Sequence, residues 1–148
     1  ASYCFKELLS KVLQSNNYES RTDYSYLDSR DRKNYLFNTK IKSIEESDLI
    51  ILIGTNPRLE ATILNSRIRK AFINNKTEIF SMNDVGDLTY PYKLINGDTE
   101  TIKNISEDNH KLSEKIKNST KPLIIFGQSS LLLKSFGFIF ESLKTFYS

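Results

Sequence analysis

A short run of apolar residues, Leu49–Ile53, constrains the fold of this chain more than any other stretch. The run has five residues, three of them isoleucine, and it ends at Gly54. Unbroken β-branched runs of this length are typical of strands that are buried on both faces of a parallel sheet. The run is too short to span a bilayer as a helix. We therefore predict a central, fully buried β-strand.

A helix is predicted directly after this strand. Asn56 can cap a helix because its side chain accepts hydrogen bonds from free backbone N–H groups. Pro57 suits the first turn because proline has no backbone donor to leave unpaired. Apolar residues then recur at helical spacing and form one stripe, while basic residues lie off it. The stripe is Ala61, Leu64, Ile68, Ala71 and Phe72, and the basic residues are Arg67, Arg69 and Lys70.

A second segment repeats this strand, glycine and helix pattern. Apolar residues 122–126 precede Gly127, and one helix is predicted over 129–147. Alternation over 77–82 predicts another strand, whereas turn-forming residues over 83–92 predict a loop. These units predict an α/β fold of Rossmann-like type, with a mostly parallel sheet of about three or more strands flanked by helices. Further helices are predicted over 3–14, 39–47 (with Ile41 and Ile44 on one face), 99–106 and 107–118.

The length of 148 residues fits a single α/β domain over 1–148. Within it, an N-terminal helix and a long loop occupy 1–33, and the βα core occupies 34–148. The loop over 18–33 is rich in Ser, Asp, Arg and Tyr and shows no period. A loop of this length is unusual in a compact domain, so it is expected to pack on a partner or to contain a short element.

Composition excludes several classes of function. The formal net charge of +3 is small and interspersed, which argues against nucleic-acid binding. Cys4 is the only cysteine and His110 the only histidine, so the chain alone cannot ligate structural zinc or an iron–sulfur cluster. We expect Cys4 in the core and His110 on the surface. No apolar run reaches the length of a membrane helix, and direct membrane insertion is not expected.

The candidate site lies in the two turns that follow the predicted strands. Gly54, Thr55 and Asn56 form one turn, and residues 127–130 form the other. Such turns can cradle a nucleotide or a phosphate at a helix N-terminus. Neither turn has a dinucleotide or P-loop fingerprint, and one glycine per turn also suits a tight strand-to-helix connection, which we favour.

Charged residues near the first turn leave alternatives open. Arg58 lies in the first helical turn, where the dipole disfavours a cation. It either faces an anion or a partner carboxylate, or it extends into solvent. Glu45, Glu46 and Asp48 could form a metal or acid pair, but a solvated helix end is the simpler interpretation. No catalytic constellation emerges from the residues.

The stretch from Ile44 to Phe72 resembles the large iron–sulfur subunit of respiratory complex I, the NADH:ubiquinone oxidoreductase. The segments I-E-E-S-D, G-T-N-P-R and N-S-R-I-R-K carry the resemblance. Residues 34–38, 87–92 and 121–127 extend it. The resemblance implies part of the C-terminal molybdopterin-oxidoreductase-like domain of that subunit. Molybdenum enzymes of this kind have a His-Pro pair after the G-x-N-P motif, where this chain has Thr62-Ile63.

The resemblance implies a structural and assembly role in the matrix arm of mitochondrial complex I, at the inner membrane. It implies no cofactor in this chain, so that Gly54, Thr55 and Asn56 are a vestigial loop. Iron–sulfur clusters, FMN and NADH are then expected in neighbouring subunits. The implied partners are other complex I subunits, above all the remaining cluster-bearing part of the large subunit.

Two other functions remain as alternatives at this point. The first is an oxidoreductase domain that binds molybdopterin or a nucleotide beside Gly54 and Gly127. The second is a module that binds anions through Arg58, Arg67 and Arg69.

Overall fold

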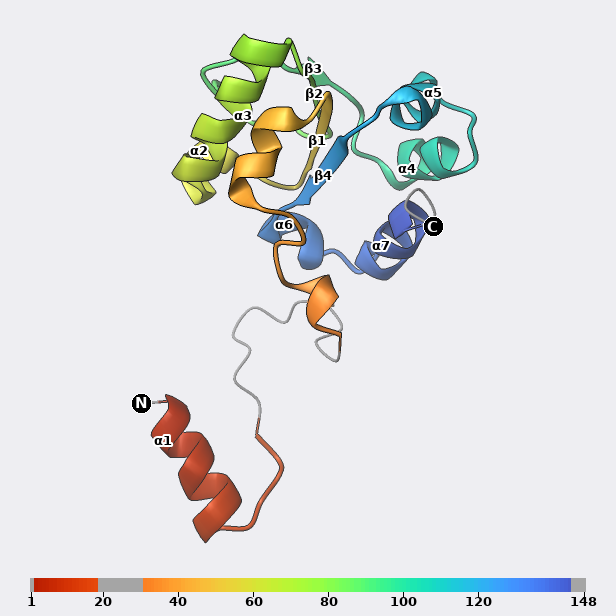
Figure 1. Cartoon of the computed structure of the whole chain (residues 1–148). Helices are drawn as coiled ribbons and strands as arrows, with labels where there is room; N and C mark the ends of the chain where they lie inside the picture. The colour runs from red at the N-terminus through yellow and green to blue at the C-terminus, as the bar shows by residue number, and fades with distance from the viewer. Residues whose placement is uncertain (1, 19–30, 145–148) are drawn as a thin grey trace.

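A computed structural model describes residues 2–18 and 31–144 and contains a four-stranded, all-parallel sheet (Figure 1). The strand order is β3-β2-β1-β4, so β1 lies between β2 and β4. β1 pairs in parallel with both neighbours, and β2 pairs in parallel with β3. The predicted α/β fold is confirmed. The strands are β1 (Leu49–Ile53), β2 (Glu78–Ser81), β3 (Lys93–Leu94) and β4 (Pro122–Phe126).

Helices cover both faces of the sheet. Figure 1 shows α2 and α3 on one side of the strands and α4, α5 and α7 on the other. The α-helices are α1 (Ser2–Glu7), α2 (Pro57–Glu60), α3 (Thr62–Asn75), α4 (Thr99–Ser106), α5 (Lys111–Asn118), α6 (Gln128–Leu131) and α7 (Phe136–Lys144). The π-helix is η1 (Leu8–Val12), and the 3₁₀-helices are η2 (Arg32–Asn34) and η3 (Ile41–Glu46).

The core consists of two layers that β1 separates. All five residues of β1 are buried, and successive side chains point to opposite faces of the sheet. Leu49, Ile51 and Ile53 pack against residues of α4, α5 and α7. Ile50 and Leu52 pack against residues of η3 and α3. The prediction of a fully buried central strand is therefore confirmed.

Asp48 joins the starts of β1 and β4, which lie far apart in the sequence. Its carboxylate accepts a hydrogen bond from the Ser119 hydroxyl, and it accepts from the backbone N–H groups of Thr120 (2.6 Å) and Lys121 (3.0 Å). Burial raises the pKa of Asp48, but these hydrogen bonds outweigh burial and hold the pKa below its usual value. The interpretation of this residue as part of a solvated helix end is thus incomplete.

Three predicted helices are shorter or broken in the structure. The helix after Asn56 divides into α2 and α3 at Ala61, whose backbone is extended (φ −150°). The predicted helix over 107–118 begins only at Lys111, because Asp108 adopts a left-handed conformation (φ 63°). The predicted helix over 129–147 is replaced by α6 and α7 with a turn between them, and residues 145–147 lie outside the described part.

The N-terminal helix forms, but its apolar side is not buried in this chain. Helix α1 and η1 cover most of the predicted range of 3–14 and stand apart from the sheet in Figure 1. Phe5 is 60% exposed and Val12 is 69% exposed. The prediction that Cys4 belongs to the core is wrong, because the helix that carries it does not pack on the sheet. Of the predicted loop over 18–33, residues 19–30 lie outside the described part.

Two smaller predictions also need correction. Ile41 is half-exposed whereas Ile44 is fully buried, because η3 meets the core only near its end, where it leads into β1. His110 is half-buried rather than on the open surface, and its Nδ1 caps α5 by accepting from the N–H of Leu112 (3.1 Å). The strand β3, which has two residues, was not predicted from the sequence.

The loop over 83–92 is confirmed, and a buried network holds it against α3. The Tyr90 hydroxyl donates to Asn65 Oδ1 (2.7 Å), and Asn65 Nδ2 donates to the carbonyl of Leu88 (3.1 Å). Burial raises the pKa of Tyr90, so this hydroxyl keeps its proton and remains a donor. The loop is therefore a fixed part of the structure beside the first turn.

Asp48 predicts a specific dependence of stability on pH. The pKa of Asp48 is lower in the folded state than in the unfolded state. The carboxylate therefore contributes fully to the free energy of unfolding above the unfolded-state pKa of about 4, and this contribution is lost as pH falls through the folded-state pKa. We expect Asp48→Asn to lower the free energy of unfolding at pH 7 by about 1 kcal/mol, near the low end for charged hydrogen bonds because the carboxylate is exposed. Urea unfolding at pH 7, 5, 4 and 3 measures this.

Asp108→Asn is the matched control, since Asp108 only pairs with Lys117 at the surface (2.5 Å). We expect it to change stability by less than about 0.5 kcal/mol. The difference between wild type and Asp48→Asn should shrink towards pH 3. A difference that stays constant across this range would contradict the role given to the carboxylate.

Candidate functional site

The two predicted turns lie side by side at the carboxyl ends of β1 and β4. These strands are neighbours, with Ile53 paired to Phe126 at the end of the ladder. The chain passes from β1 to β2 and β3 on one side, and then crosses to β4 on the other. This is the topological switch point of the sheet, where open α/β folds place their ligands. The structure thus brings the candidate residues together at the expected position.

Backbone atoms of the two turns are in close contact. A Cβ added to Gly54 would lie 2.7 Å from the backbone nitrogen of Ser130, and Gly54 has a left-handed conformation (φ 59°). A Cβ added to Gly127 would meet the carbonyl oxygen of Gly54 and lie 2.6 Å from Cα of Thr55. Both positions require glycine, because a side chain at Gly54 would overlap the second turn and a side chain at Gly127 would overlap the first turn. The space between the turns is filled by the protein itself.

Four hydrogen-bond donors at the first turn have partners within the chain. Asn56 Oδ1 accepts from the N–H groups of Arg58 (3.1 Å) and Leu59 (3.3 Å), which confirms the predicted N-cap. The Glu60 carboxylate accepts from the Thr55 hydroxyl and from the Asn56 N–H, both at 3.0 Å. A carboxylate of the chain therefore takes the position that an anionic ligand would occupy at this helix start.

The loop over 83–92 also binds the first turn. Asn56 Nδ2 donates to the carbonyl of Val85 (2.9 Å). Arg58 Nη1 donates to the Asp87 carbonyl (2.8 Å) and pairs with its carboxylate (2.6 Å). The N–H of Thr89 and the Arg58 guanidinium hold the pKa of Asp87 below its usual value. Of the alternatives for Arg58, the carboxylate partner is the one that the structure contains.

The other charged candidates do not converge on one site. Arg67 of α3 forms an ion pair with Glu45 of η3, and Glu46 forms an ion pair with Lys121 (2.6 Å). Arg69 is exposed on α3. Across the residues that the structure describes, no group of three or more His, Cys, Asp or Glu side chains could hold a metal ion.

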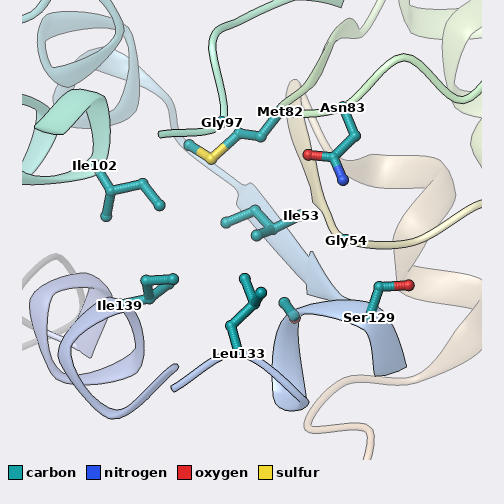
Figure 2. A pocket seen from close by; sticks show the side chains of 10 residues that line it. Ile53, Gly54, Met82, Asn83, Gly97, Ile102, Ser129, Leu133 and Ile139 are labelled. Carbon is teal, nitrogen blue, oxygen red and sulfur yellow. The ribbon is translucent and has the colours of Figure 1, made fainter. Parts of the chain in front are cut away.

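A small cavity lies beside the turns, between the sheet and the helices α4 and α7. Its volume is about 160 Å³. Figure 2 shows the side chains of Ile53, Ile102, Leu133 and Ile139 around it, with Asn83 near the Gly54 turn. Pockets for small molecules and cofactors usually measure about 300–1,000 Å³. This cavity is smaller than that range, and its lining is mostly apolar.

Sequence reasoning missed the role of Glu60 in the first turn, and it placed Ser130 in the second turn (127–130) without assigning its contact. Glu60 follows the N-cap Asn56 by four residues, close to the spacing of a capping box, and this signal could have identified it. The contact that Ser130 makes carried no comparable signal. The Ser130 hydroxyl donates to the carbonyl of Gly127 (2.7 Å), a contact that depends on how tightly the second turn closes.

Comparison with known proteins agrees with this geometry. A sequence profile described as molybdopterin oxidoreductase matches residues 1–147. The chain is 39% identical to the NADH-ubiquinone oxidoreductase 75 kDa subunit of Reclinomonas americana over 97% of its length, which is 22% of that protein. It is 35% identical to a subunit of the NADH-quinone oxidoreductase of Rickettsia bellii over 86% of the chain and 18% of the relative.

A third relative is the mitochondrial NADH dehydrogenase [ubiquinone] iron-sulfur protein 1 of Solanum tuberosum, at 32% identity over 82% of the chain and 16% of that protein. The chain thus spans about a fifth of the length of the relatives it matches. The resemblance found in the sequence is confirmed, since these relatives are subunits of NADH-oxidising quinone reductases by name. With a family profile that covers nearly all of it, this chain belongs to the molybdopterin oxidoreductase family.

Proposed function

We propose that the chain is a structural part of the large iron–sulfur subunit of mitochondrial complex I. The observation that carries the proposal is the 39% identity to a 75 kDa subunit over 97% of the chain. Its role is to bury surface against neighbouring subunits and fix their positions while electrons pass elsewhere. A stable contact of this kind typically buries about 1,600 Å² in total.

The closed turns support a role without a bound cofactor. The family profile implies a molybdopterin group, so its fit can be tested on the residues of the switch point. Gly54 and Gly127 contact each other's turns, and Glu60 accepts from the Thr55 hydroxyl and the Asn56 N–H, two donors that a phosphate could otherwise use. The adjoining cavity of about 160 Å³ is smaller than pockets that hold cofactors. A molybdopterin dinucleotide does not fit this arrangement.

The names of the relatives support the proposed location and partners. The relative from Solanum tuberosum is named as mitochondrial, and the relative from Reclinomonas americana is named as a subunit of NADH-ubiquinone oxidoreductase. No helix among the described residues is long and apolar enough to cross a membrane. In this proposal, by resemblance to these relatives, the chain lies on the matrix side of the inner membrane, bound to the cluster-bearing remainder of the large subunit. The clusters, FMN and NADH belong to those neighbours in this proposal.

A pterin- or nucleotide-binding oxidoreductase domain is the second candidate. It is favoured by one observation, the position of the two turns at the switch point of a parallel sheet. The anion-binding alternative has less support, because Arg58 and Arg67 are each paired with a carboxylate of the chain.

Assembly into complex I can be measured directly. We expect the chain, detected with an antibody after native-gel separation of mitochondrial membranes from the source organism, to migrate with NADH-oxidising activity. Depletion of the chain should reduce the amount of that band, since neighbouring subunits would lose a contact surface. Migration of the chain away from the activity would contradict the proposal.

Cofactor content separates the two candidate functions. Purified chain, and complex isolated through it, should contain no stoichiometric molybdenum by elemental analysis, and the purified chain should release no stoichiometric nucleotide on denaturation. The reason is that the donors at Thr55 and Asn56 already bind Glu60. One molybdenum or one nucleotide per chain would favour the oxidoreductase domain.

The role of Gly127 also differs between the candidates. In a purely structural turn, Gly127→Ala should lower the free energy of unfolding by about 1–3 kcal/mol, because its Cβ would overlap the first turn. Gly137→Ala is the control, since no atom lies near its added Cβ and alanine favours the helix. Urea unfolding measures both. An unchanged stability of Gly127→Ala would indicate room at the turn and count against a closed site.

A further inference from the structure

β4 is an edge strand with an apolar sequence. β1 lies on one side of it, and no strand among the described residues lies on the other. Every residue of β1 is buried, whereas four of the five residues of β4 are only half-buried. The strand reads PLIIF and carries no charge. β4 is therefore less buried than β1, although it also carries large apolar side chains on both faces.

The direction of each backbone group in β4 follows from the ladder with β1. The N–H of Gly127 donates to the carbonyl of Ile53 (2.8 Å), so Gly127 faces β1. Successive residues of a strand face opposite sides of the ladder, which directs Leu123 and Ile125 to β1 as well. Ile124 and Phe126 then direct their N–H and C=O groups to the outer edge. This row of donors and acceptors matches another extended strand.

The opposite edge of the sheet has protection that β4 lacks. β3 has only two residues, and one of them is Lys93, which pairs with Glu78 (3.0 Å). Short edge strands and lysine side chains discourage the addition of another strand. In β4 the only such feature is Pro122, which occupies the first position of the strand, so the later residues Ile124 and Phe126 keep their outward N–H groups. The two edges thus differ in their capacity to accept a partner.

Topology and the relatives indicate which partner fits. The order β3-β2-β1-β4 is the first part of the doubly wound order 3-2-1-4-5-6, in which the next parallel strand lies beside β4. The matched relatives contain about five times the length of this chain. We propose that the outer edge of β4 binds a parallel, apolar strand from the large-subunit polypeptide that this chain does not span. The proposal rests on the proposed function and specifies its contact surface.

Hydrogen exchange resolved to single amides tests the contact in the wild-type protein. In the isolated chain, the amides of Leu123, Ile125 and Gly127 should exchange slowly, and those of Ile124 and Phe126 should exchange fast. In complex I isolated from mitochondrial membranes, the two outer amides should become protected by roughly a hundredfold or more, as for hydrogen bonds in a buried strand. Unchanged exchange of Ile124 and Phe126 in the complex would overturn the proposal.

A proline substitution supplies a second test with matched controls. Of the backbone hydrogen-bonding groups, Ile124→Pro removes only an outward N–H, so it should reduce incorporation of the chain into the complex at least about tenfold by removing a bond to the added strand. Ile124→Ala controls for the lost side chain. Leu94→Pro removes the outward N–H of β3 on the other edge and should leave incorporation unchanged. Equal incorporation of Ile124→Pro and Ile124→Ala would contradict the proposal.

The outcomes separate this proposal from the one on which it rests. A chain that enters complex I with exposed outer amides keeps its proposed function and loses this contact. A chain that is absent from complex I refutes both, and the native gel shows this before any exchange is measured. Protection in the isolated chain that rises with protein concentration would instead identify a second copy of the chain as the partner, and would overturn the proposal.

Discussion

The structure depends on the complete burial of β1 between two strands and two helical layers. Each backbone group of a buried strand needs a hydrogen-bond partner, so β1 requires a neighbour on both sides. β2 and β4 meet this requirement in parallel ladders. Its side chains supply both layers of the core, and each buried Leu or Ile contributes about 1.5–3 kcal/mol.

The position of β4 is fixed at both of its ends. At the start, the Asp48 carboxylate binds the segment that leads into the strand. At the finish, the turn at Gly127 lies against the turn at Gly54, where neither tolerates a side chain. These contacts join segments that are more than seventy residues apart in sequence. The same close contact that aligns the two strands also fills the usual ligand position of this fold, which supports the proposed role without a bound cofactor.

Local signals in the sequence were sufficient for the strands β1, β2 and β4 and for the Asn56 cap. Apolar, β-branched runs and a capping residue act over a few neighbours, so they are visible without tertiary contacts. The break at Ala61, the two-residue β3 and the exposure of Cys4 depend on packing between distant segments. The candidate turns were located correctly, but their closure by Glu60 and Ser130 required the geometry of both strands together.

The closed turns and the open edge have opposite consequences for function. At the switch point, the Thr55 hydroxyl and the Asn56 N–H already donate to Glu60, so a ligand that used these donors would have to displace this carboxylate and separate the turns. At the outer edge of β4, binding requires no such displacement, since the outward groups of Ile124 and Phe126 meet an extended strand directly. New contacts therefore form at lower cost at the edge of the sheet than at the switch point. This asymmetry favours a domain that binds polypeptide over one that binds a cofactor.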